Sequence, residues 1–548
     1  MCKSKFYSNL QYTDVCKHTL SEVLRVNRAR VVPRRQENKS MKSRKLVLGG
    51  LLAAATILAT VVVPITANAA PTGDLIFVRN QDFASFNPDV AQNDSIFIQQ
   101  QVYEPLFMIT SDGKDVRPWL AKSATVGSDK VTWTIKLRTD IKFSDGTPMT
   151  SADVKFSLDK ATAGDGWGFL NTAIDNISTP SSDVVVIKTK FPWAPLLSDL
   201  ACFSNSILKN NYGGATAADF FKSPIGTGPF KLDHWTPGTE IKLVANGTYW
   251  QPGKPYLNSV TWKYVVDDNT REFMLKGGQA DINEEPPASS IASLKAAPGI
   301  KVGLFPAAQS RFLAFNHKVP ALSDVNVRRA ISYAIDRKAL IKVVLSGNGF
   351  ASNSILAPNV GFYDAKTPGI QYDMKKAAKE LAKSKYKKGL TLEFLASGGS
   401  LEDTAVASIL QASLKKLGIK LVIKTQEPSV KRKTQKAMEY QMTTTGWTMD
   451  ISDPDELLTF ALSPEGGTNA FYTNYSNAKV IAAVKKGQTN VDPKVRQIAY
   501  SFVQKQVAED AMMGFLYNAP YKYAWRSNIT GFAVTPTYSY HMEDVKKG

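Results

Sequence analysis

Three aspartates, Asp450, Asp453 and Asp455, lie close together in GWTMDISDPDE (446–456) and raise the question of a calcium site. Their spacing lacks the glycine and the terminal glutamate of an EF-hand loop, so calcium binding is not predicted. A carboxylate accepts hydrogen bonds without donating any, which suits an ammonium ion. The structural alternative is that Asp450 caps a helix beginning around Asp453-Pro454-Asp455, where proline is favoured in the first turn.

Residues that point to catalysis are few. The histidines after residue 70 are His234, His317 and His541, widely spaced and without an H-E-x-x-H zinc motif. The sequence has no G-x-S-x-G nucleophile elbow and no G-x-x-x-x-G-K-[ST] phosphate loop. GTG in PIGTGPF (224–230) is too short for a dinucleotide fingerprint and is typical of a turn before a strand. We therefore predict no catalytic residue, no metal and no cofactor, and keep a secreted enzyme as a remote alternative.

The first 70 residues are predicted to direct secretion. Basic MKSRK (41–45) precedes the apolar run LVLGGLLAAATILATVVVPI (46–65) and the small-residue site Ala67-Asn68-Ala69. We predict a signal peptide over 41–69, with residues 1–40 as a mis-assigned upstream extension. The alternative is an uncleaved membrane anchor, because the apolar run is long enough to span a bilayer. No cysteine lies just after this run, where a lipoprotein would need one, so lipid anchoring is not predicted. The mature chain is expected outside the cytoplasmic membrane, extracellular or periplasmic and associated with the cell envelope.

The charge balance argues against a nucleic-acid-binding protein, and the cysteine content excludes a disulfide within the mature chain. The net charge of +19 falls to +10 without residues 1–70, because 55 basic and 45 acidic residues remain. This mild excess is not a nucleic-acid footprint. Cys2 and Cys16 lie in the upstream extension, so Cys202 stands alone in the mature chain and is expected to be a small buried hydrophobe.

A length of 548 residues suggests roughly three domains, and the patterns predict a mixture of helices and strands. Apolar residues recur at helical spacing in 325–340, with Asp324 placed to cap that helix. A helix from 401 is followed by Gly418 and a strand, an order typical of α/β folds. Strands are predicted at 74–80, 131–138, 183–191, 240–246, 259–266, 390–396 and 420–426.

KFSDGTPMTSADVKFSLDKA (142–161) combines a turn with a capped helix. Asp145-Gly146 supplies the turn, and Thr150 is predicted as the N-cap with Asp153 reaching back to its backbone N–H. Nothing in this stretch requires a ligand.

Several blocks, taken in order, resemble the family 5 extracellular solute-binding proteins, the peptide and nickel receptors of ABC importers. They are residues 103–123 and 142–161, PIGTGPFKLDHWTPG (224–238), NVRRAISYAIDR (326–337), WTMDISDPDELLTF (447–460) and NYSNAKVIAAV (474–484). The resemblance covers about 75–535. It implies a monomeric receptor that binds a peptide or another small solute and delivers it to the membrane subunits of an ABC permease. No nucleic-acid partner is expected.

The resemblance implies an α/β fold of two lobes with an extra domain inserted in the first. The first lobe would comprise 71–103, 222–306 and 514–548, the inserted domain 104–221, and the second lobe 307–513. Segments crossing between the lobes are expected near 308–316 and 512–521. Lobes joined in this way close on a ligand by hinge motion.

The resemblance also implies a binding site around Asp450, which would pair with the α-ammonium of a peptide. Trp447 would wall the pocket, with Gly446 and Thr448 beside it. Some dipeptide-type relatives place an arginine early in the preceding helix, but SLEDTAVASILQA (400–412) contains no arginine or lysine. This difference favours oligopeptides over dipeptides, while nickel chelates, oligosaccharides and other solutes stay open.

Overall fold

The computed structural model describes residues 71–90, 95–464, 471 and 473–548. The predicted upstream extension (1–40) and signal peptide (41–69) lie outside them. Across the described part of the chain, no helix is long and apolar enough to cross a membrane.

Sheet I contains the first strand of the described chain and one of the last, in the order β12-β19-β11-β1-β10-β9-β8. Its core contains the buried rings of Phe77, Trp262 and Tyr523. The strands are β1 (Asp74–Arg79), β8 (Phe230–Thr236), β9 (Glu240–Ala245), β10 (Ser259–Tyr264), β11 (Ile282–Glu284), β12 (Ile300–Phe305) and β19 (Tyr521–Arg526).

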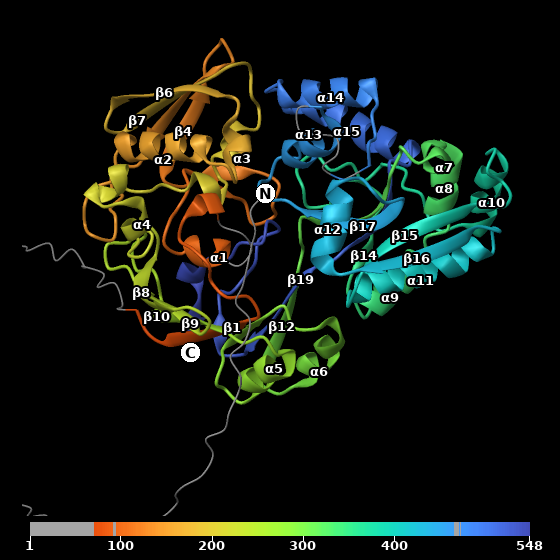
Figure 1. Ribbon diagram of the computed structural model, residues 1–548. Coiled ribbons are helices and arrows are strands. Elements are labelled where there is room, and N and C mark those ends of the chain that lie inside the picture. Colours follow the sequence, from red (N-terminus) through yellow and green to blue (C-terminus); the bar gives the residue numbers. More distant parts are fainter. Residues whose placement is uncertain (1–70, 91–94, 465–470, 472) are drawn as a thin grey trace, which may run out of the picture. The chain divides into compact units, whose positions relative to one another are not determined.

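Sheet II has the order β14-β18-β13-β17-β15-β16, and its two faces bury different helices. Leu313 and Phe394 face α8, α9 and α11, whereas Phe312 and Phe515 face α13, α14 and α15. Figure 1 shows the second group of helices above the sheet. The strands are β13 (Gln309–Phe315), β14 (Phe350–Ala351), β15 (Thr391–Ser397), β16 (Lys420–Gln426), β17 (Met442–Thr448) and β18 (Met513–Asn518).

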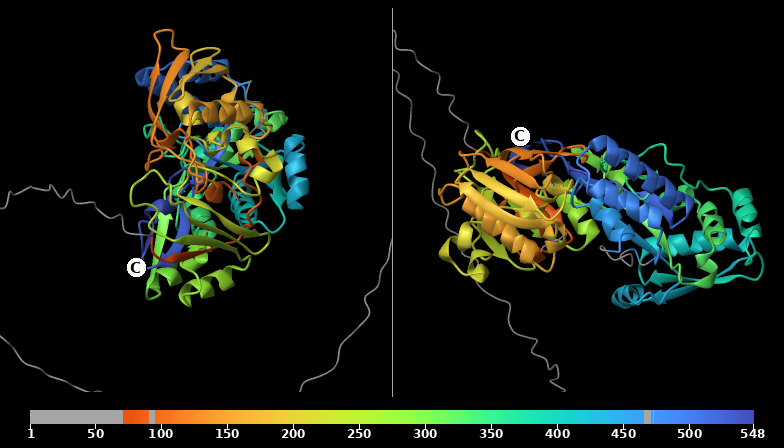
Figure 2. Two further views of the ribbon diagram at one scale, coloured as in Figure 1. Left: turned by 90° about the vertical axis from the view of Figure 1, so that its left-hand side faces the viewer. Right: turned by 90° about the horizontal axis from the view of Figure 1, so that it is seen from above.

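Sheet III is antiparallel, with the order β4-β5-β7-β6. Val154 and Leu158 of α2 pack on Ile135 and Val185 of this sheet, and Figure 2 shows α2 running behind it. The strands are β4 (Ala121–Val126), β5 (Thr132–Leu137), β6 (Ile174–Ser181) and β7 (Val184–Thr189).

The remaining elements surround these sheets. Two short strand pairs are β2 (Phe107–Ile109) with β3 (Val116–Pro118), and β20 (Ile529–Thr530) with β21 (Lys546–Lys547). The helices are α1 (Ile96–Gln99), α2 (Ser151–Ala163), α3 (Leu196–Asp199), α4 (Ala217–Phe220), α5 (Asp268–Lys276), α6 (Ile291–Ala296), α7 (Pro320–Ser323), α8 (Val325–Tyr333), α9 (Arg337–Val344), α10 (Met374–Ala382), α11 (Leu401–Lys415), α12 (Pro428–Lys436), α13 (Asp455–Leu462), α14 (Ala478–Gln488) and α15 (Pro493–Glu509).

The chain passes from sheet I to sheet II between β12 and β13, and returns between β18 and β19. The predicted crossing segments, 308–316 and 512–521, contain β13 and β18, which are antiparallel neighbours in sheet II. The predicted boundary at 514 therefore falls inside β18. The division into domains stays a prediction.

Most of the elements predicted from local sequence patterns are present in the structure. Each predicted strand corresponds to one of β1, β5, β7, β9, β10, β15 or β16. The backbone N–H of Thr150 donates to Asp153 Oδ2 at 2.7 Å, which confirms the capping box. Cys202 is buried, as expected.

The single helix predicted over 325–340 is wrong. Asp324 caps α8 by accepting from the N–H of Asn326 at 2.9 Å, as predicted. The helix then ends after Tyr333, and Asp336 accepts from the N–H of Ala339 at 2.9 Å to start α9. An aspartate that caps a new helix competes with continuation of the old one, and the apolar period alone does not register this competition.

Candidate functional site

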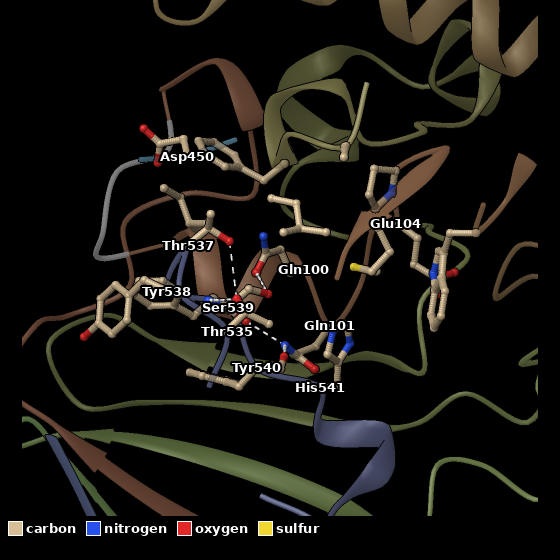
Figure 3. A pocket seen from close by; sticks show the side chains of 18 of the residues that line it. Gln100, Gln101, Glu104, Asp450, Thr535, Thr537, Tyr538, Ser539, Tyr540 and His541 are labelled. Atoms are coloured by element: carbon tan, nitrogen blue, oxygen red, sulfur yellow. Dashed lines mark hydrogen bonds between the residues drawn. The ribbon is translucent and has the colours of Figure 1, made fainter. Parts of the chain in front are cut away.

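A cavity lies where the chain around α1 and the segment 535–543 meet the C-terminal end of β17. Figure 3 shows Asp450 on one side of this cavity and Glu104 on the other. Thr448 and Asp450 are its lining residues from the β17 segment. The polar residues on the opposite walls are Gln100, Gln101, Glu104, Thr535, Thr537, Tyr538, Ser539, Tyr540, His541 and Glu543.

Strand β17 reaches this cavity with one edge open. It pairs with β13 along its whole length, from Met442 to Thr448, but pairs with β15 only at Met442 and Thr443. On the open side, the C=O of Thr444 accepts from Gln435 Nε2 at 3.3 Å. Because backbone groups two residues apart in a strand point the same way, those of Gly446 and Thr448 face this open side too.

Asp450 follows directly after this strand, and the fold holds its backbone rather than its carboxylate. Its N–H donates to Glu456 Oε2 at 3.0 Å. Among the described residues, its carboxylate has no hydrogen-bond or ion-pair partner. Burial raises the pKa of Asp450. The pKa of the neighbouring Glu456 is raised well above its usual range by burial and by the charge of Asp450.

Asp453 is used by the fold itself. Its carboxylate lies 2.7 Å from Arg496 Nη2, and it accepts from the N–H of Asp455 at 3.0 Å where α13 begins. The alternative in which Asp450 caps this helix is therefore wrong, because Asp453 supplies the hydrogen bond at that end.

The other three predicted site residues have different surroundings. Thr448 lines the cavity, and its hydroxyl oxygen accepts from Gln309 Nε2 at 3.0 Å. Trp447 donates from Nε1 to Glu456 at 3.0 Å, and its ring contacts Phe460 and packs on the helical core beside it. Gly446 lies opposite Arg311 of β13. The structure thus brings Asp450 and Thr448 together at the cavity, while Trp447 and Gly446 lie behind them on the same strand.

Comparisons with known proteins identify the family of this chain. Residues 115–469 match the family described as "Bacterial extracellular solute-binding proteins, family 5 Middle". The chain belongs to this family. Its family membership makes it a solute-binding protein of an ABC importer, not an enzyme; such proteins bind small solutes and deliver them to ABC permeases.

The alignments of this family 5 protein with individual relatives cover nearly the whole length of each relative. It is 27% identical over 482 residues to the glutathione-binding protein GsiB of Escherichia coli (strain K12), covering 86% of this chain and 94% of GsiB. NikA from Brucella suis, solved in complex with Fe(III)-EDTA, is 25% identical, with a TM-score of 0.78 over 87% of this chain and 100% of NikA. The periplasmic binding protein DppA from Helicobacter pylori, solved with peptide STSA, is 25% identical, with a TM-score of 0.72 over 87% and 98%.

The sequence did not identify the acidic wall opposite Asp450. Glu104 is buried and accepts from Trp119 Nε1 at 2.8 Å and from the Tyr249 hydroxyl at 3.1 Å. Burial raises the pKa of Glu104 to about 7. The only sequence signal was its place in YEPLF (103–107), which marked the family and not the site.

His541 lines the same wall beside Glu543, with 3.0 Å between Nδ1 and Oε1. Burial alone would lower the pKa of His541, but the Glu543 carboxylate outweighs it and raises that pKa. Within the described ranges, no group of three or more His, Cys, Asp or Glu is arranged to hold a metal ion.

Proposed function

We propose that this family 5 protein captures peptides in the cavity beside β17 and delivers them to an ABC permease. The observation that carries the proposal is the Asp450 carboxylate, which lines the cavity without a partner among the described residues. The described lining residues include no lysine or arginine to neutralise it. A peptide α-ammonium would supply that partner through a charge-assisted hydrogen bond.

The open edge of β17 supports a peptide over a compact solute. Among the described residues, Thr444 to Thr448 have no strand partner on the β15 side, and an extended peptide binds such an edge through backbone hydrogen bonds. Backbone pairing depends little on side-chain identity, so this arrangement favours a receptor that accepts many sequences.

The relatives point in the same direction. Glutathione, named for GsiB, is a tripeptide, and the DppA structure was solved with a peptide. The Fe(III)-EDTA complex of NikA gives the competing class of solute, a metal chelate. Oligopeptides fit this chain better than dipeptides, because its α11 carries no arginine for a nearby carboxylate.

The proposal includes secretion and closure. The signal over 41–69 would be removed near Ala70, leaving a monomer outside the cytoplasmic membrane whose lobes close on the solute. N-terminal sequencing of the secreted protein checks the first point, and a start at Met1 would contradict it. Small-angle scattering checks the second, because only a closed form contacts the solute from both sides; an unchanged radius of gyration with a bound ligand would contradict closure.

Native mass spectrometry of the purified protein, followed by calorimetric titration, tests the ligand class. The titrations compare glutathione, pooled synthetic peptides and a nickel–histidine chelate against the parent and Asp450→Asn. Saturable peptide binding that weakens in the variant supports the proposal. Binding of the chelate alone, or peptide binding indifferent to Asp450→Asn, would overturn it.

A further inference from the structure

A second charged group, the Arg311 guanidinium, lies on the pair formed by β13 and β17. Arg311 is opposite Gly446, on the far side of Thr448 from Asp450. Arg311 of β13 donates from Nε to Glu402 Oε1 at 2.9 Å, and its Nη2 pairs with the other oxygen of that carboxylate. Tyr517 donates to Glu402 Oε1 at 2.6 Å. A guanidinium held in this two-pronged way has a fixed orientation.

Gly446 determines where this guanidinium lies. A Cβ atom added at Gly446 would lie 2.4 Å from Arg311 Nη1 and 2.9 Å from its Cδ, so Arg311 crosses the strand through space that any side chain would occupy. The crossing places Nη1 above β17, on the stretch whose β15 side is open. This gives Gly446 a physical role in positioning Arg311.

The Arg311 guanidinium retains free donors. Nε and Nη2 make the two bonds to Glu402, and the Tyr517 hydroxyl, itself bonded to Glu402, also interacts with the guanidinium. Among the described residues, no carboxylate or carbonyl oxygen accepts from Nη1. The Arg311 side chain is 30% exposed, against 15% for Glu402, so a solute can reach it. An arginine with one edge fixed and the other edge open is arranged to receive a carboxylate.

The spacing along β17 sets a length. Gly446 lies in β17 and Asp450 follows two residues beyond the end of that strand at Thr448, so the two are at most about 13 Å apart, the span of four extended residues. An extended peptide of about four residues has a similar span between its ammonium and its carboxylate. One ligand can therefore contact Asp450 with its N-terminus and Arg311 with its C-terminus.

We infer that Arg311 Nη1 binds the C-terminal carboxylate of the ligand, so that the receptor favours free-acid peptides of about four residues. This inference rests on the proposed function. Arg311 of β13 would then make the contact to the ligand carboxylate for which α11 has no arginine. Glu402, in the first turn of α11, holds Arg311 and does not itself contact the ligand.

The test uses randomised peptide pools of two, four and eight residues, each as free acid and as C-terminal amide, with retained peptides quantified by mass spectrometry. We expect the parent to retain four-residue acids about tenfold or more over the matching amides, as a charge-assisted contact implies. Arg311→Gln should reduce this ratio below about twofold. The matched control Arg432→Gln, on the exposed face of α12, should leave it unchanged.

Two further variants separate binding from folding. Gly446→Ala displaces the guanidinium, and Glu402→Gln removes one of the two acceptor oxygens that orient it, so both variants should weaken the preference for acids while Asp450-dependent retention persists. Peptide retention that depends on Asp450 but shows equal acid and amide binding in the parent would overturn this inference and leave the proposed function standing. Failure of every pool to bind would overturn both.

Discussion

Asp450 and Asp453 lie three residues apart between β17 and α13, yet the fold uses only one of the two carboxylates. Asp453 is 5% exposed, pairs with Arg496 and accepts the N–H of Asp455. Asp450 is fixed through its backbone, and its carboxylate opens on the cavity without a partner among the described residues. The difference separates charge that stabilises the structure from charge that is available to a solute.

The largest expected effect is on stability, at Asp453. Asp453→Ala leaves Arg496 buried without its carboxylate, and breaking a buried pair in this way costs about 3–5 kcal/mol of unfolding free energy. Urea denaturation measures the loss. The double variant Asp453→Leu with Arg496→Met should recover much of it, because neither charge then remains buried alone. A loss in the range of a surface pair, below about 1 kcal/mol, would show that Asp453 is not used by the fold.

The next effect is on binding, at Asp450. Asp450→Asn keeps the shape and removes the charge, so peptide affinity should fall by about 1.5–3 kcal/mol while the unfolding free energy changes little. Asp450→Ala, measured for both properties, is the stricter variant because asparagine keeps a carbonyl oxygen that can still accept from an ammonium ion. A variant that melts earlier but binds peptides like the parent would reverse the assignment of the two aspartates.

The pH dependence of affinity gives a smaller, graded effect. Enclosure raises the pKa of Asp450 to about 7, and only the ionised carboxylate pairs with an ammonium ion. Affinity should therefore be highest between about pH 7 and 8, where the carboxylate is ionised and the peptide α-amino group (pKa about 8) is still protonated, and should fall by up to about tenfold per unit as pH decreases below 7. Glu104 and His541 titrate in the same cavity, so the informative quantity is the difference between the parent and Asp450→Asn. Parallel profiles for the two proteins would contradict the prediction.

Local relationships in the sequence predicted much of the fold. Thr150 with Asp153, and Asp324 with Asn326, interact within three residues, and their patterns predicted both helix starts correctly. Helix α8 ended early because Asp336 starts a new helix, a competition that the apolar period does not contain. Asp450 was selected from its family block, and its role as the ligand anchor stays a prediction.

Long-range relationships could not be predicted. The Arg311–Glu402 pair joins residues 91 positions apart, and it requires the register in which β13 places Arg311 opposite Gly446. Glu104 and Trp250 meet across 146 positions. Such contacts depend on which strands are neighbours, and one sequence does not specify that through its local period.

The smallest expected effect concerns Trp447, which shares with Asp450 the carboxylate that holds the Asp450 backbone in place. Trp447 is one of three donors to Glu456, the others being the N–H groups of Asp450 and Ile451 at 3.0 and 3.1 Å. Trp447→Phe keeps a ring against Phe460 but removes the indole N–H. Because the other two donors remain, we expect the unfolding free energy to fall by about 1 kcal/mol and peptide affinity to change by less than about threefold. Calorimetric titration beside urea denaturation checks both values. A large loss of affinity with unchanged stability would instead place the Trp447 ring in direct contact with the ligand, as the family resemblance implied, and would extend the solute-facing region inward from Asp450 along β17.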